Sequence, residues 1–445
     1  MALSLHRGAI LHFPTATHNP ADDHVYHADG VLLIDDGKIL ALSSAEQFFA
    51  ADENQHWLNS PNYIKHQGLI LPGMIDSHVH FPQMEIIASY GNQLLDWLNQ
   101  YTFPAESQFG DQAYANQQAE FFIQQLFKHG TTSACVYATI HPESVNAFFE
   151  QAQAHHACMI AGKVMMDRHC PDNLRDEAQQ SYHQSKALIE QWHKTDRLLY
   201  AVTPRFAPTS TPLQLQLAGQ LATEHPDTFI QTHISENKDE IAWVASLYPE
   251  SKDYLDVYQQ NNLVRERCLL GHGIHLTERE KQAIADTGAS ISFCPSSNLF
   301  LGSGLFPYFE AKERGIPVSI ASDVGGGTSL SLFANQSDAY KILQLQNQSL
   351  NPFESLYLCT QGAAVAMGLE HDIGNLNQGT AADFIVLDTQ GSDMLSQRLQ
   401  KTTTLSEALF AYIVLGDDRA IEKTYVAGKQ VYQSTLTADN RTAVS

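Results

Sequence analysis

Short apolar runs alternate with helix-like stretches along most of the chain. Most of the runs are rich in Val, Ile, Ala and Thr and are unbroken by charge, which is typical of strands buried on both faces. Eight such runs separated by helical stretches are the pattern of a (β/α)8 TIM-type barrel, an α/β fold. The eight runs lie at residues 69–80, 131–138, 157–166, 198–205, 228–234, 268–272, 289–294 and 316–323.

The stretch after the first run shows the helical period clearly. Tyr114, Phe121, Phe122 and Leu126 recur at positions i, i+7, i+8 and i+12, which places them on one face of a helix. A cationic last turn followed by glycine, at residues 128–130, is a typical helix stop. We therefore predict a helix that ends at this point.

The two ends of the chain have a different pattern. Residues 30–42 form two apolar runs around an Asp-Gly turn, which indicates a hairpin, and residues 382–387 and 424–432 are also strand-like. Neither end has enough strands to be stable alone, so we predict that they pair into one small β-sandwich-like domain. The predicted division is 1–68 and 377–445 in this domain and 69–376 in the catalytic barrel, with solvated loop or frayed chain at 22–27 and after Ser434.

The chain is strongly acidic. Its 445 residues include 49 Asp and Glu against 26 Lys and Arg, for a formal net charge of −23. A field of that sign repels phosphate backbones and anionic membrane surfaces, so we expect no nucleic-acid partner. No run approaches the roughly 20 apolar residues of a membrane span, and we expect no membrane partner and no signal peptide. The six cysteines include no CxxC pair, so we expect free thiols in the cytoplasm.

Polar residues with useful chemistry stand where apolar runs end. The first run closes with His78 and His80, and side chains at i and i+2 of a strand point to the same side. Active sites of this fold lie at the carboxyl ends of the strands, and imidazole is the commonest ligand for Zn²⁺. A lone histidine there is more often structural, but His233, Glu236, His272 and Asp323 stand at the ends of other runs. The joint pattern favours a metal site.

Longer segments match a known family. The motif at residues 72–80, Pro-Gly-Met-Ile-Asp-Ser-His-Val-His, resembles the opening motif of the amidohydrolase superfamily, which are metal-dependent hydrolases on a (β/α)8 barrel with a β domain formed from both termini. The resemblance covers nearly the whole chain. It implies a cytoplasmic, typically homodimeric hydrolase that acts on guanine in purine catabolism. Similarity to the guanine-deaminating members is carried by Gln83 and by residues 93–106, 203–207, 232–237 and 322–327.

The resemblance implies one metal ion at the mouth of the barrel. The four matching ligands are His78, His80, His233 and Asp323, and such a set leaves room for water on a catalytic Zn²⁺. Fe²⁺ is the alternative, because the same ligands accept either ion. Some members bind two metals through a lysine at the end of the fourth strand, but residues 202–206 contain none. We therefore expect one ion per chain.

The implied reaction gives roles to three polar residues. The metal would lower the pKa of bound water and supply hydroxide, and Asp323 would accept the water proton as general base. His272 is expected to orient the hydroxide, with a second metal ligand as the alternative. Glu236, as a neutral carboxylic acid, would protonate N3 of guanine during attack at C2 and pass the proton to the leaving amine. The alternative for Glu236 is an exposed loop carboxylate.

Recognition of the purine is assigned to three further side chains. Arg205 only donates, so it would bond the C6 carbonyl of guanine and oppose the amino group of adenine; the alternative is a salt bridge. Gln83 offers a donor and an acceptor to a ring edge, and Phe206 would stack on the ring unless it only packs in the core. We also expect substrate contacts from His80, His233, Glu236 and Asp323.

Two other functions stay open from the sequence. A sibling amidohydrolase would deaminate another aminated heterocycle, such as cytosine, a triazine or a modified purine. Arg205, Phe206 and Gln83 argue against this, because they suit a free base with a carbonyl. A scaffold that has lost catalysis would be expected to have broken ligands, whereas all four are present together with Glu236 and His272. Lys163, in the third run, is expected to be structural or at the surface.

Overall fold

A parallel β-barrel forms the larger part of the molecule. The computed structural model describes residues 3–90 and 94–435. Neighbouring strands of the barrel are parallel, and the short strand β8 also pairs in parallel with β9. The barrel closes where the first and last strands meet, because the amide of Asp323 donates to the carbonyl of His78 at 2.9 Å and the amide of His80 to Val324 at 2.8 Å. The strands are β5 (Met74–His80), β6 (Thr131–Tyr137), β7 (Cys158–Gly162), β8 (Val164–Met165), β9 (Leu198–Pro204), β10 (Phe229–Ile234), β11 (Cys268–His272), β12 (Ser290–Phe293) and β13 (Val318–Ile320).

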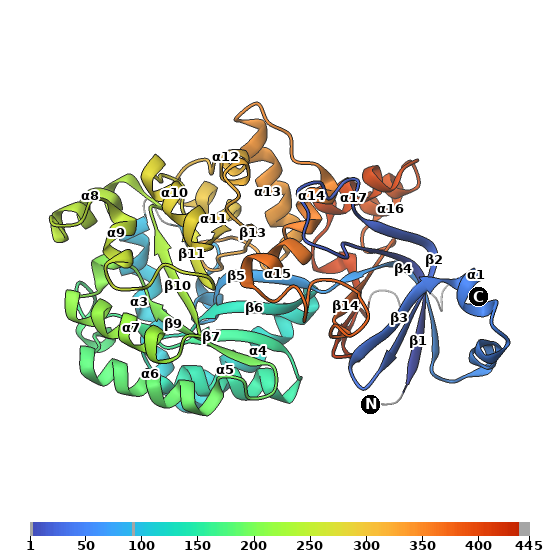
Figure 1. Cartoon of the computed structure of the whole chain (residues 1–445), viewed down its shortest axis with the longest axis horizontal. Coiled ribbons are helices and arrows are strands. Elements are labelled where there is room, and N and C mark those ends of the chain that lie inside the picture. The colour runs from blue at the N-terminus through green and yellow to red at the C-terminus, as the bar shows by residue number, and fades with distance from the viewer. Residues whose placement is uncertain (1–2, 91–93, 436–445) are drawn as a thin grey trace.

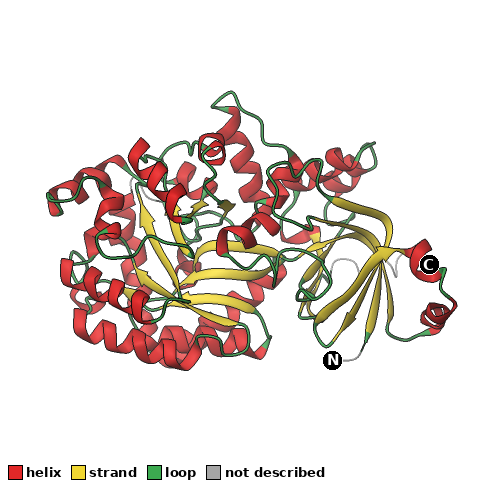
Figure 2. Cartoon of the chain, in the orientation of Figure 1, coloured by secondary structure: helices red, strands yellow, loops and turns green. Residues whose placement is uncertain are grey.

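Helices cover the outside of the barrel, as Figure 2 shows in red around the yellow strands. Side-chain caps begin several of them; Asp111 accepts from the amides of Ala113 and Tyr114 at the start of α4. None of the helices in the described residues is long and apolar enough to span a membrane. The helices of the barrel part are α4 (Gln112–Lys128), α5 (Pro142–Ala154), α6 (Ala178–Trp192), α7 (Pro212–Glu224), α8 (Lys238–Leu247), α9 (Tyr254–Gln259), α10 (Glu278–Thr287), α11 (Pro295–Phe300), α12 (Tyr308–Glu313), α13 (Leu332–Gln344), α14 (Pro352–Tyr357) and α15 (Gln361–Met367).

A chain of short helical turns connects β5 to α4. It is composed of η2 (Phe81–Ile86), α2 (Leu94–Trp97), η3 (Leu98–Thr102), α3 (Phe103–Glu106) and η4 (Ser107–Gly110). Trp97, Leu98 and Phe103 from these turns are buried against one another and against neighbouring barrel loops. The connection therefore forms part of the wall at the carboxyl end of the barrel.

Both ends of the chain build a second sheet beside the barrel (Figure 1). Its seven strands run in the order β16-β15-β14-β4-β1-β2-β3, and only the β1–β4 pair is parallel. The predicted barrel and the predicted union of the termini are both confirmed. The elements of this part are β1 (Ser4–His12), β2 (Val25–Asp35), β3 (Lys38–Ser44), α1 (Ala45–Phe49), η1 (Asp52–Asn59), β4 (Tyr63–Pro72), β14 (Phe384–Leu387), α16 (Asp393–Leu399), α17 (Leu405–Leu415), β15 (Ile421–Val426) and β16 (Lys429–Gln433).

Some predicted elements differ in their limits. The first apolar run, 69–80, is two strands, because the chain changes sheets at Gly73, whose amide bonds the carbonyl of Asp383 at 2.9 Å. Both halves are buried, so no polar residue marks the boundary. The third run, 157–166, is split into β7 and β8 at Lys163. The predicted barrel limit at residue 69 falls within β4; as domain boundaries, 1–68, 69–376 and 377–445 stay predictions.

Two local predictions were wrong and one lies outside the described residues. The polar segment 22–27 was expected to be loop, but β2 begins at Val25 and pairs with the end of β1. The four positions predicted to share one apolar face of α4 are not all buried: Phe121 is 48% exposed, because the buried face follows Ala119, Phe122 and Leu126. Ser434 lies directly after β16, and the tail from residue 436 onward lies outside the described residues.

Lys163 is structural and deeply buried. Its Nζ pairs with Asp176 and donates to the hydroxyl of Ser181 at 3.1 Å. Burial lowers the pKa of its ammonium. These partners hold Lys163 within the structure, so of the two expected positions the structural one is correct.

Candidate active site

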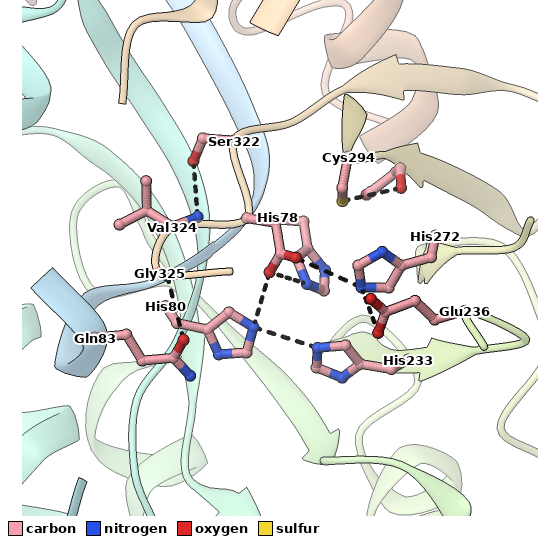
Figure 3. A network of polar contacts seen from close by, with 12 residues as sticks. His78, His80, Gln83, His233, Glu236, His272, Cys294, Ser322, Val324 and Gly325 are labelled. Atoms are coloured by element: carbon pink, nitrogen blue, oxygen red, sulfur yellow. Dashed lines mark hydrogen bonds and ion pairs between the residues drawn. The ribbon is translucent and has the colours of Figure 1, made fainter. Parts of the chain in front are cut away.

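Five side chains of types that bind metals, four histidines and one aspartate, converge at the carboxyl end of the barrel (Figure 3). Nε2 of His78 and Nε2 of His80 each lie 3.3 Å from Oδ1 of Asp323. Nε2 of His233 lies 3.2 Å from Nε2 of His80, and Nε2 of His272 lies 3.6 Å from Oδ2 of Asp323. Residues from β5, β10, β11 and the loop after β13 thus meet in one place, as the strand-end pattern predicted.

The backbone after β13 turns sharply to present Asp323. This residue has a φ of 48°, in the left-handed region, and its amide is bonded to His78. Beneath it, the buried carboxylate of Asp76 accepts from the amide of Ser322 at 3.0 Å and from its hydroxyl. Burial raises the pKa of Asp76 to about 7. Asp76 therefore ties the first and last strands together directly below the cluster.

Two of the imidazoles have a defined tautomer. Nδ1 of His233 donates to the carbonyl of Arg205 at 2.7 Å, so its Nε2 carries a lone pair directed at His80. Nδ1 of His272 donates to the amide oxygen of Asn298 at 3.0 Å, so its Nε2 faces the carboxylates of Asp323 and Glu236. Such outer hydrogen bonds are the usual means of orienting metal ligands and catalytic imidazoles.

The cluster fits a divalent metal ion. Nε2 of His78 is buried without a hydrogen-bond partner among the described residues, which is costly unless another group satisfies it. Burial lowers the pKa of His78 to about 4 and also lowers the pKa values of His80 and His233, so these imidazoles are neutral. Burial acts to raise the pKa of Asp323, but the adjacent imidazoles of His78, His80 and His272 outweigh it and hold that pKa well below its ordinary value. Neutral imidazoles beside a carboxylate are a suitable donor set for zinc.

Geometry alone does not single out the four expected ligands. One ligand atom from each of His78, His233, His272 and Asp323 can be chosen so that all lie within 4.8 Å of one another. His80 is not in that group, although it lies 3.2 Å from His233 and 3.3 Å from Asp323. His80 and His272 are thus both placed to contact a metal, and the assignment between them stays a prediction.

Glu236 faces His272 from the other side. Its Oε2 lies 3.5 Å from Nε2 of His272, and its Oε1 accepts a hydrogen bond from the hydroxyl of Ser303 at 2.8 Å. Burial raises the pKa of Glu236 to about 7. Burial acts to lower the pKa of His272, but the nearby carboxylates of Glu236 and Asp323 outweigh this effect and raise that pKa. Glu236 is buried, so its alternative interpretation as an exposed loop carboxylate was wrong.

The cluster opens into a cavity of about 440 Å³, including its open mouth. The predicted contact residues Gln83, Arg205, Phe206 and Glu236 all line it, beside Trp97 and Leu98 from the β5–α4 connection. The predicted site residues lining the cavity are His80, Gln83, Arg205, Phe206, His233, Glu236, His272 and Asp323; His78 does not line it.

Arg205 lines the cavity and also forms a buried salt bridge. Its Nη1 donates to both carboxylate oxygens of Glu106, at 2.9 and 2.7 Å. Both bonds of the salt bridge use a single nitrogen, Nη1. The salt bridge is therefore compatible with the predicted contact between Arg205 and a substrate. Gln83 also donates to Glu106, at 3.0 Å, while its amide oxygen accepts from Gly325 at 3.2 Å.

Sequence reasoning missed three supporting residues: Glu106, Asn298 and Ser303. Glu106 ends a segment that carried the family resemblance, and this position is the one signal that could have drawn attention to it. Asn298 and Ser303 come from α11 and the loop after it. They follow no strand-end pattern, so nothing in their spacing predicted contacts with His272 and Glu236.

Comparison with known proteins agrees with this architecture. The amidohydrolase family model matches residues 69–431. Guanine deaminase of Escherichia coli K12 is 46% identical over 432 residues, covering 96% of this chain and 97% of that protein. The solved structure of E. coli guanine deaminase matches with a TM-score of 0.92 at 43% identity, covering 98% of this chain and 100% of that one. Guanine deaminase from C. acetobutylicum, solved with bound guanine in the active site, matches with a TM-score of 0.86 at 29% identity, covering 97% and 100%.

The fold and the histidine–aspartate cluster define a metal-dependent hydrolase on a (β/α)8 barrel. The chain belongs to the amidohydrolase family. Each of the three relatives described above is a guanine deaminase.

Proposed function

We propose that the protein is a guanine deaminase, which hydrolyses free guanine to xanthine and ammonia. The observation that carries the proposal is the position of Glu236: a buried carboxyl with a pKa of about 7 lines the same cavity as the histidine–aspartate cluster, 3.5 Å from Nε2 of His272. High identity to guanine deaminases over nearly the whole chain supports the same substrate. The reaction adds water at C2, forms a C2–O bond and breaks the C2–N bond to the amino group.

The proposed metal site holds one divalent ion through His78, His80, His233 and Asp323. When bound, the ion supplies a Lewis acid that lowers the pKa of a coordinated water toward neutrality. Zn²⁺ is the proposed ion and Fe²⁺ the alternative, because the donor set suits both. The other roles belong to the protein's own side chains.

Three side chains manage the protons. The carboxylate of Asp323 is ionised and accepts the proton of the attacking water. Glu236 holds a proton on Oε2, since Ser303 donates to Oε1, and delivers it to N3 of the base as water attacks C2. Glu236 then takes the C2 hydroxyl proton and gives it to the departing amine as the C2–N bond breaks. The water proton held by Asp323 restores the acid form of Glu236. His272 bridges them, because its Nε2 lies 3.5 Å from Glu236 and 3.6 Å from Asp323. In this position His272 holds the nucleophile against C2.

The wall of the cavity provides recognition of the base. Arg205 offers its remaining guanidinium hydrogens to the C6 carbonyl, and an amino group there would place donor against donor. Gln83 bonds the neighbouring ring edge, and Phe206 packs on the purine face. His80, His233, Glu236 and Asp323 contact the reacting edge. A free base fits this description, and the net charge of −23 disfavours nucleic acid.

An ammonia-release assay tests the proposal. Purified protein of measured metal content is incubated with guanine, adenine, cytosine and a triazine, and we expect ammonia from guanine well above the others, with xanthine as the co-product. Faster turnover of another base would support a sibling amidohydrolase instead. No turnover of any base by metal-replete protein would support the scaffold alternative. His78→Ala is the matched variant, and it should lose both metal and activity.

The proposal places the protein in guanine degradation, in the cytoplasm, as a homodimer. The family resemblance favours all three, and the six free cysteines, of which five are buried, suit a reducing compartment. Light scattering of the purified protein measures the oligomeric state.

A further inference from the structure

Glu106 lies behind the wall of the cavity and does not line it. It ends α3, is only 1% exposed, and accepts hydrogen bonds from two residues that do line the cavity. Arg205 bonds both of its oxygens through Nη1, and Gln83 bonds Oε1. A ligand in the cavity therefore meets Arg205 and Gln83, and each of these is held from behind by the same carboxylate.

These contacts form a continuous chain around the cavity. Gln83 is fixed at its other end by the amide of Gly325, two residues after Asp323. The carbonyl of Arg205 accepts from Nδ1 of His233, so the same residue also orients an imidazole of the cluster. The chain Gly325–Gln83–Glu106–Arg205 thus connects the end of β13, through the β5–α4 connection, to the end of β9.

Glu106 is the counterion of Arg205. A buried guanidinium without a counterion is strongly unfavourable, and among the described residues Glu106 is the one carboxylate in ion-pair contact with Arg205. Nη1 makes both bonds to Glu106, and no hydrogen bond to a described residue occupies Nε or Nη2. Glu106 therefore does two things: it anchors the side chain and leaves its other donors for a ligand.

On this basis we propose that Glu106 is a specificity-determining positioning residue, which locks Arg205 and Gln83 into one rigid donor set for a carbonyl on the six-membered ring of the substrate. The inference rests on the proposed function for the identity of the ligand class, an oxopurine. Glu106 acts only through the two residues it holds. Its loss should therefore weaken the preference for a carbonyl without a comparable loss in binding of the bare ring.

Two ligands that cannot be deaminated isolate this effect. Hypoxanthine and unsubstituted purine both lack an amino group, and they differ in the C6 carbonyl and its adjoining ring proton. Equilibrium dialysis of purified, metal-containing protein measures both dissociation constants. For the unmodified protein we expect hypoxanthine to bind at least about tenfold more tightly, a difference of about 1.4 kcal/mol.

Glu106→Gln removes the charge while keeping the size and one acceptor oxygen. We expect the preference for hypoxanthine to fall to less than about threefold, with purine affinity changed by less than twofold, which is below about 0.7 kcal/mol for each ratio. Glu106→Asp keeps the charge on a shorter side chain and should restore part of the preference. It also serves as the test variant if Glu106→Gln fails to fold, and in that role it should show a reduced preference.

Asp383→Asn is the matched control. Asp383 is another buried carboxylate that pairs with an arginine, Arg197, but it lies among the terminal strands and not at the cavity. Its substitution should lower thermal stability and leave the hypoxanthine preference unchanged.

The outcomes are distinct. An unchanged preference in the Glu106 variants overturns the proposal, as does an equal loss of affinity for both ligands or the absence of a preference in the unmodified protein. The ammonia assay with guanine is a separate measurement. If guanine is not deaminated but the preference depends on Glu106, the proposed function fails and the positioning role of Glu106 stands.

Discussion

Gly271 lies directly against the imidazole of His78. A Cβ placed on its backbone would be 2.5 Å from Cε1 and 2.9 Å from Nδ1 of that ring, closer than real Cβ contacts. Gly271 belongs to β11 and His78 to β5, so the contact crosses the interior of the barrel. The absence of a side chain at Gly271 is therefore what allows His78 to reach Asp323.

Gly271→Ala should displace His78 and weaken the metal site. We expect a loss of metal content and a fall in guanine turnover of at least about 100-fold, the size of effect seen when a group at an active site is misplaced by about 1 Å. Overpacking should also cost about 1–3 kcal/mol of stability. Elemental analysis, turnover and thermal melting measure the three effects.

Gly219→Ala is the control for overpacking. It would place a Cβ 1.8 Å from the carbonyl oxygen of Asn261, away from the cavity. It should reduce stability but retain metal and turnover below its melting temperature. Full metal content and activity in Gly271→Ala would contradict the role given to this glycine.

His80 and His272 should behave differently when replaced. If His80 is a metal ligand and His272 is not, His80→Ala loses both metal and turnover, whereas His272→Ala keeps the metal and loses turnover. Both imidazoles are within 3.6 Å of Asp323, so distances do not decide between them. Elemental analysis of the two variants does, and metal loss from His272→Ala alone would reverse the assignment.

A buried histidine remote from the cavity provides the comparison. His66 pairs with His6 at 2.9 Å within the terminal sheet. His66→Ala should retain metal.

Removal of metal by dialysis against a chelator should abolish turnover and lower the melting temperature, because an ion that binds only the folded protein stabilises it. Readdition of Zn²⁺ or Fe²⁺ identifies which ion restores activity.

Turnover should fall as pH rises through neutrality. Burial raises the pKa of Glu236 to about 7, and the protonated form is the one that delivers a proton to the base. Glu236 is therefore mostly protonated below pH 6 and mostly ionised above pH 8, and kcat/KM for guanine should decline about tenfold per pH unit on the alkaline side. A pH–rate profile of the metal-loaded protein measures this limb.

Two substitutions separate Glu236 from other titrating groups. The hydrogen bond from Ser303 favours the ionised carboxylate, so Ser303→Ala should raise the pKa of Glu236 further and move the alkaline limb to higher pH. Glu236→Gln should reduce kcat/KM by about 10²–10⁴-fold and remove the limb. An unmoved limb in Ser303→Ala would show that another group controls it.

The strand ends were predictable because a barrel imposes a strict rule on them. A buried strand requires an unbroken apolar run, and the first polar residues after it must face the mouth, so His78, His233, His272 and Asp323 stood out. The boundary between β4 and β5 was not predictable, since the end of β4 and all of β5 are buried and nothing polar separates them.

The supporting residues were not predictable for a different reason. Asn298 and Ser303 are separated from their partners by 26 and 67 positions, and no periodic pattern links such pairs. The bond between Arg205 and Glu106 spans 99 positions. Hydrogen bonds between side chains on different elements depend on the folded arrangement, whereas strand-end positions depend only on local sequence.

Asn298 should control turnover through His272. Its amide oxygen accepts from Nδ1 of His272 at 3.0 Å, which keeps Nε2 of that ring directed at Glu236 and Asp323. Asn298→Ala removes the acceptor and frees the other tautomer, and we expect kcat to fall about 10–100-fold with metal content and KM for guanine nearly unchanged. Asn298→Asp keeps an acceptor and should recover part of the rate.

The control is Asn335→Ala, because Asn335 is equally buried and bonds the carbonyls of Ser329 and Ser331 away from the cavity. That variant should lose stability and keep kcat, so equal kcat losses in the Asn298 and Asn335 variants would reduce Asn298 to a packing residue.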